Sequence, residues 1–178
     1  NCVTHGIMAF LCICSLPAAA VYSYNKSGSE LAAGVSVFIL CLFLMFLVST
    51  LYHCMPFGTT HKYVFRKLDH ICIYFAIAGS YTPIALTLIG GWQGYLILAI
   101  EWSAVLGGVL LKAISSKSYP KLSMTIYMIM GWTAIFFLPT LLSKASPLFL
   151  VLIVGGGVMY TIGAFFYGKP QKKYFHSI

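Results

Sequence analysis

Apolar runs about as long as a membrane is thick recur along the whole chain, and they constrain the fold more than any other feature. A helix needs about 20 predominantly apolar residues to cross a hydrocarbon core of about 30 Å. The sequence predicts six such spans, joined by short loops that contain Gly, Ser and Pro. They cover residues 4–24, 32–54, 69–89, 94–113, 122–142 and 147–167. A seventh begins near Tyr174, so we expect the 178 residues to end inside it.

The composition favours an all-α polytopic membrane helix bundle over a soluble protein. Hydrophobic residues make up 60% of the chain and charged residues 8%, with a mean hydropathy of +0.92. A soluble domain carries about a quarter charged residues. We therefore expect a single integral-membrane domain over residues 1–178. The six cysteines lie in apolar segments without a CxxC pair, which predicts buried, unreactive thiols.

Lysine and arginine residues indicate the orientation of the predicted spans. Nine of the eleven follow the second, fourth or sixth span: Lys62, Arg66, Lys67, Lys112, Lys117, Lys121, Lys169, Lys172 and Lys173. The loops after the first and fifth spans hold only Lys26 and Lys144. The positive-inside rule then places the N-terminus in the cytoplasm. The net charge of +8 is thus explained by topology rather than by nucleic-acid binding, and anionic lipid headgroups are the expected partners of the cytoplasmic face.

Polar side chains that could bind a metal gather at the predicted cytoplasmic ends of the spans. Four histidines stand at such ends: His5, His53, His70 and His176. Asp69 begins the third span, and a short loop between antiparallel spans would allow it to meet His53. Ser49 and His53 are spaced i and i+4, which puts them on one helix face. Imidazole is a common zinc ligand, and a nearby carboxylate can bind the metal or deprotonate a metal-bound water.

From spacing alone, a structural explanation is slightly favoured over a metal site. Histidine is at home at a membrane interface, Asp69 could cap the third helix, and Ser49 could bond to its own helix backbone. Glu101 lies within the fourth span, where an acid is either functional or hydrated near the outer interface. Small residues around Pro83 predict close helix packing and a kink, and the glycines at 155–157 also predict close packing.

Four segments resemble the motifs of a known family. STLYH (49–53) and RKLDHICIYFAIAGSYTP (66–83) resemble the central signature of the hemolysin III family, within the progestin and adipoQ receptor superfamily. NCVTHGIMA (1–9) resembles the end of its first-helix motif, and KKYFHSI (172–178) resembles the start of its last-helix motif. The short loops fit the bacterial-type branch. The resemblance implies a seven-helix bundle in the plasma membrane with its N-terminus in the cytoplasm.

The resemblance also implies a zinc ion near the cytoplasmic face. His53 and His176 match two of its ligands, and a further histidine is expected two positions beyond the last residue. Asp69 matches the acid that reaches the zinc through water, and Ser49 matches the serine that lines the site. His5 belongs to a family motif as a structural neighbour rather than as a ligand.

Three functions are compatible with these expectations. The first is a zinc-dependent intramembrane hydrolase of a lipid amide, with Asp69 and Ser49 as catalytic residues. The second is a non-enzymatic sensor of membrane state, or receptor-like regulator, in which the zinc is structural. The third is a cytolysin, as the family name suggests, although the sequence contains no amphipathic arm. The sequence identifies neither the lipid nor the oligomeric state.

Overall fold

The computed structural model describes residues 2–114 and 120–167, and the chain divides into two compact units, Asn1–Tyr119 and Pro120–Ile178. The described residues are almost entirely helical and contain no strand. Within them, five helices are long and apolar enough to cross a membrane. The predicted all-α membrane class is therefore confirmed.

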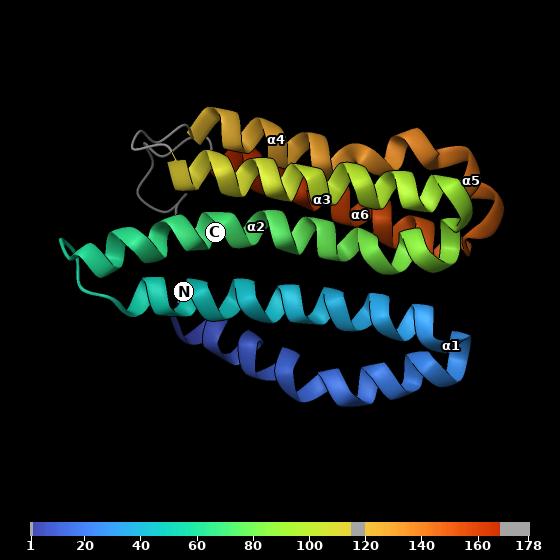
Figure 1. The fold of residues 1–178 in the computed structure, drawn as a ribbon, viewed down its shortest axis with the longest axis horizontal. Helices are drawn as coiled ribbons and strands as arrows, with labels where there is room; N and C mark the ends of the chain where they lie inside the picture. Colours follow the sequence, from blue (N-terminus) through green and yellow to red (C-terminus); the bar gives the residue numbers. More distant parts are fainter. Residues whose placement is uncertain (1, 115–119, 168–178) are drawn as a thin grey trace. The chain divides into compact units, whose positions relative to one another are not determined.

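The first unit begins with α1 (Cys2–Cys54), which folds back on itself (Figure 1). Its helical geometry is broken at Ser27 and Gly28, and Gly28 has a φ of 77°. Glycine adopts such a left-handed conformation at little cost because it has no Cβ. The break gives α1 two arms, which correspond to the predicted spans 4–24 and 32–54. The free ends of both arms lie at the same end of the unit, away from the break (Figure 1).

The chain continues through α2 (Thr60–Pro83) and a π-helical stretch, η1 (Ile84–Ile89). Thr59 caps α2, because its side-chain oxygen accepts a hydrogen bond of 3.2 Å from the backbone N–H of Lys62. The helix thus begins nine residues before the predicted span 69–89, since its first turns are polar but still helical. Proline cannot donate the next helical hydrogen bond, and the backbone after Pro83 widens into η1.

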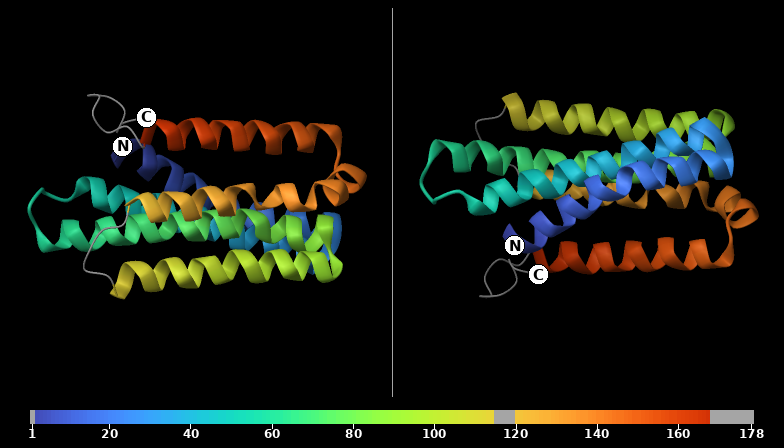
Figure 2. Two further views of the ribbon diagram at one scale, coloured as in Figure 1. Left: turned by 90° about the horizontal axis from the view of Figure 1, so that it is seen from above. Right: turned by 90° about the horizontal axis from the view of Figure 1, so that it is seen from below.

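After a turn at Gly90, α3 (Gly91–Ile114) runs back beside α2. Glu101 lies in the middle of α3 and is 0% exposed, so it is buried rather than hydrated at an interface. Figure 2 shows the arms of α1, α2 and α3 as neighbouring, roughly antiparallel rods.

Small residues allow the helices of the first unit to approach closely. A Cβ placed on Gly34 would lie 2.7 Å from Cα of Pro83, and one on Gly79 would lie 2.8 Å from Cβ of Cys41. Both pairs join the second arm of α1 to α2. The close packing predicted for residues 78–83 is therefore confirmed, whereas at the place of the predicted kink the structure has the π-helical stretch η1.

The second unit contains α4 (Pro120–Trp132), a 3₁₀ stretch η2 (Thr133–Phe137), α5 (Leu138–Lys144) and α6 (Pro147–Tyr167). The first three elements correspond to the predicted span 122–142. α6 packs on α4, where Gly157 lies under the Trp132 ring. A Cβ on Gly155 or Gly156 would meet no described atom within 4 Å. The close packing predicted for the glycine run is therefore observed at Gly157 within this unit.

Candidate functional site

The candidate site lies at the end of the first unit where the first arm of α1 begins and the second arm ends. His5 is on the first turns of the first arm, whereas Ser49 and His53 are on the last two turns of the second arm. The arms bring these residues together because they run back from the break at Gly28 over similar lengths. The predicted placement of Ser49 and His53 on neighbouring turns of one helix is also observed.

A hydrogen bond joins His5 to Ser49 at the centre of the site. The distance between His5 Nδ1 and Ser49 Oγ is 2.8 Å, and Ser49 is only 6% exposed. The alternative prediction was a hydrogen bond from Ser49 to the backbone of its own helix. The neighbouring Thr50 makes a bond of this kind, because its Oγ1 donates to the Phe46 carbonyl. The Ser49 hydroxyl is therefore held by a side chain from the other arm.

The His5 ring also contacts two rings of the second arm. Its centroid lies 5.9 Å from that of His53 and 5.8 Å from that of Phe46, both in edge-on arrangements. Such geometry is favourable for aromatic rings. His5 therefore lies between Ser49 and His53, although the sequence had suggested only a structural neighbour.

Asp69 approaches the site from α2. Asp69 is partly buried in the first half of α2, the helix whose start is tied to the end of α1 that carries His53. Thr59, ten positions earlier, is the N-cap of α2, so the alternative role of Asp69 as a helix cap is wrong. The neighbouring His70 is bound to its own helix, because its Nδ1 lies 2.6 Å from the Arg66 carbonyl.

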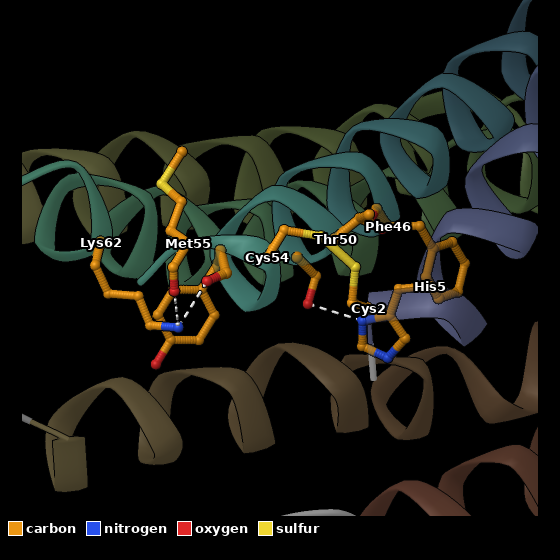
Figure 3. Close-up of a disulfide and its surroundings, with 9 residues drawn as sticks. Cys2, His5, Phe46, Thr50, Cys54, Met55 and Lys62 are labelled. Carbon is orange, nitrogen blue, oxygen red and sulfur yellow. Dashed lines mark hydrogen bonds between the residues drawn. A yellow bond between two sulfur atoms is a disulfide. The ribbon is translucent and has the colours of Figure 1, made fainter. Parts of the chain in front are cut away.

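A disulfide joins the two arms beside this cluster (Figure 3). It links Cys2 to Cys54, whose Cα atoms lie 5.9 Å apart, within the usual range for a disulfide. The prediction of buried, unreactive thiols is therefore wrong for this pair. Of the free cysteines, Cys12, Cys41 and Cys72 are buried as predicted, whereas Cys14 is exposed. Sequence reasoning missed the pair because 52 positions separate the two residues.

Lys62 fixes the loop that follows His53. Its Nζ donates to the backbone carbonyls of Tyr52, at 2.9 Å, and Met55, at 3.0 Å (Figure 3). The same ammonium group lies 4.5 Å from the Tyr52 ring centroid and 4.4 Å from the Phe57 ring centroid. A cation placed at the C-terminal carbonyls of a helix is favourable for the helix dipole. The end of α1 that carries His53 is therefore tied to the start of α2.

The donor types at the site suit zinc, although the described residues do not complete a site. His53 offers an imidazole nitrogen and Asp69 a carboxylate, both of which are zinc ligands or partners of zinc-bound water. In residues 2–114 and 120–167, no group of three His, Cys, Asp or Glu side chains is placed to hold a metal. The other expected ligand, His176, lies outside the described residues.

The long apolar helices define a multi-pass helical membrane protein with a polar cluster at the end of one unit. The family model described as "Haemolysin-III related" matches residues 1–176. The chain belongs to the hemolysin III family.

Named relatives agree with this assignment. Hemolysin-3 of Bacillus cereus and the Hemolysin-3 homolog of Bacillus subtilis are each 33% identical over all 178 residues, covering 81% and 83% of those proteins. The human monocyte to macrophage differentiation factor is 24% identical over 94% of the chain and 69% of its own length. No solved structure matches the chain significantly.

Proposed function

We propose that this protein is a zinc-dependent hydrolase that cleaves an amide bond of a membrane lipid. The observation that supports it most is the cluster itself: a buried serine held by His5, a neighbouring His53, and a carboxylate, Asp69, in the first half of α2.

In this proposal His53 and His176 would hold the zinc, and Asp69 would act on it through a water molecule. When bound, the zinc supplies a Lewis acid that polarises the carbonyl of the substrate. Lys62 and the disulfide hold the end of α1, so the orientation of His53 is fixed from both sides. Rigid support of this kind raises metal affinity.

Asp69 and Ser49 perform the remaining chemistry in this proposal. Asp69 takes a proton from the water that attacks the amide carbon, and the proton passes to the leaving amine as the carbon–nitrogen bond breaks. With its hydrogen on Nδ1, His5 donates to Ser49 Oγ and leaves the serine hydroxyl to donate to the developing oxyanion. The products are a carboxylate and an amine.

A substrate within the membrane suits the surroundings of the site. Four basic residues cluster at the site end of the first unit: Lys62, Arg66, Lys67 and Lys112. A basic rim attracts anionic headgroups of the bilayer. We propose that this end faces the cytoplasm across the plasma membrane, that the two arms of α1 cross separately to give six crossings, and that a seventh helix carries His176.

Metal content tests the proposal. The full-length protein, purified in detergent, is compared with His53→Ala and with the matched control His61→Ala, which removes an exposed histidine near the same end. We expect about one zinc per chain in the unaltered protein and the control, and a loss of zinc in His53→Ala. A screen of lipid amides with the zinc-loaded protein then measures release of the amine. If no sample contains zinc, the proposed metal site is contradicted. If zinc is bound but no lipid is cleaved, a structural metal in a membrane-state sensor is favoured.

A further inference from the structure

We propose that Cys2 and Cys54 form a reversible redox switch that controls the metal affinity of the neighbouring site. This inference rests on the proposed function for its metal, but the thiol pair itself is observed independently of it. The pair lies outside the polar groups that the proposed chemistry uses.

The position of the pair connects it directly to the site. Cys54 follows His53 in the chain, and Cys2 precedes His5 by three residues, which is about one helical turn. The bridge therefore joins the residue next to the expected metal ligand to the turn that carries the partner of Ser49 (Figure 3). It fixes the distance between the two arms at the point where the site is built.

The His5 contacts provide a route from the disulfide to the site. His5 reaches the second arm through its 2.8 Å contact with Ser49 and its edge-on contact with His53. Both contacts depend on how closely the first turn of the first arm lies against the last turns of the second arm. Opening the bridge frees this end of the first arm, so the ring of His5 is no longer held over Ser49 and His53.

The pair is also exposed on the surface of the first unit. Cys54 is exposed and Cys2 is partly exposed, whereas Cys12, Cys41 and Cys72 are buried. The lysine and arginine distribution predicts that this end faces the cytoplasm, where disulfides are rare and usually transient or redox-sensing. An accessible pair at that end is suited to reversible exchange.

The redox step is an ordinary thiol–disulfide exchange. On oxidation, the two thiols lose two protons and two electrons as the sulfur–sulfur bond forms, and a low-molecular-weight disulfide accepts them to become two thiols. The oxidised pair holds the site in the observed arrangement and favours metal binding. The reduced pair loosens it and weakens metal binding.

The test uses the full-length protein in detergent, equilibrated with mixtures of oxidised and reduced glutathione. Mass spectrometry of peptides measures the Cys2–Cys54 cross-link, and competition with a chelator measures zinc affinity in each state. We expect zinc to bind about tenfold more tightly to the oxidised protein, since loss of supporting contacts around a metal ligand lowers affinity by about 10- to 100-fold. In Cys2→Ser/Cys54→Ser the difference should vanish, whereas the control Cys14→Ser, an exposed free cysteine of the same arm, should retain it.

The outcomes separate the two proposals. Equal zinc affinity in both states, or failure of glutathione to open and close the cross-link, overturns the switch and leaves the hydrolase proposal intact. Absence of zinc from every sample, the double serine variant included, overturns the proposed function and the switch together. Melting temperatures of all variants, measured without metal, show whether a change in affinity reflects global unfolding.

Discussion

His5 and Ser49 are 44 positions apart in the sequence, yet His5 Nδ1 and Ser49 Oγ lie 2.8 Å from each other. This pair marks where the two arms of α1 meet, and it holds the serine hydroxyl in a buried position. The pair is therefore the most direct point at which to test how the site is assembled.

His5→Phe should show energetic coupling to Ser49→Ala. Phenylalanine keeps a ring against Phe46 and His53 but cannot bond to the serine, so its buried oxygen loses its partner at a cost of about 1–3 kcal/mol. Once Ser49 is alanine, the same change should cost less. A double-mutant cycle on the free energy of unfolding in detergent should give a coupling of about 1 kcal/mol. Strictly additive effects would mean that the contact contributes nothing.

If the proposed function holds, Asp69→Asn should strongly lower the rate of lipid amide hydrolysis while the protein remains folded. Asparagine has nearly the same shape but cannot accept the proton from the attacking water, so the rate should fall by about 10²- to 10⁴-fold. The measurement is amine release by zinc-loaded protein in detergent micelles. Glu30→Gln is the matched control, because Glu30 is an exposed acid near the break in α1, far along the arm from the site. Full activity in Asp69→Asn contradicts the assigned role.

Gly79→Ala should destabilise the packing of α1 against α2. The added Cβ would lie 2.8 Å from Cβ and 2.9 Å from Sγ of Cys41, so the helices must separate, at a cost of about 1–3 kcal/mol. Gly156→Ala is the control, since a Cβ there meets no described atom within 4 Å. Alanine at that helical position should be neutral or stabilising by about 0.5–1 kcal/mol. Thermal unfolding in detergent distinguishes the two, and equal melting temperatures contradict the close approach.

Lys62→Met should loosen the connection between α1 and α2. Methionine keeps most of the length of the side chain but loses both hydrogen bonds to the carbonyls of Tyr52 and Met55. We expect the free energy of unfolding to fall by about 1–2 kcal/mol. Hydrogen bonds to charged groups are stronger than neutral ones, but the Lys62 ammonium group is partly solvated. Lys121→Met, at an exposed lysine of α4, should have almost no effect. Hydrogen exchange of residues 52–60 should quicken only in the first variant.

Apolar periodicity predicted the helices well because membrane-length runs leave few alternatives. It placed the ends less well: α2 begins at Thr60 rather than near 69, since hydropathy detects the apolar part of a helix and not its polar first turns. From the sequence, Pro83 predicted only a kink, whereas the structure has the wider π-helical stretch η1. Proline removes one helical hydrogen bond, and the bonds that replace it depend on tertiary packing.

The candidate site was predicted in part. Ser49 and His53 follow from helical spacing, Asp69 follows from the short loop, and His5 was expected at the same end as a structural neighbour. Its bond to Ser49 and the Cys2–Cys54 pair were missed. A signal for them exists: Cys2 lies 26 positions before Gly28 and Cys54 lies 26 positions after it. Using that symmetry requires knowing that the chain reverses at Gly28, and a single glycine among many does not reveal this.

The break at Ser27 and Gly28 also offers experimental access. It lies at the opposite end of the first unit from the disulfide and the polar cluster (Figure 1). A short epitope inserted between these two residues extends a turn that already departs from helical geometry, without touching Ser49 or His53. Labelling that epitope in intact cells and in inverted vesicles reports which side of the bilayer this end faces, and one inserted position thereby orients the entire first unit.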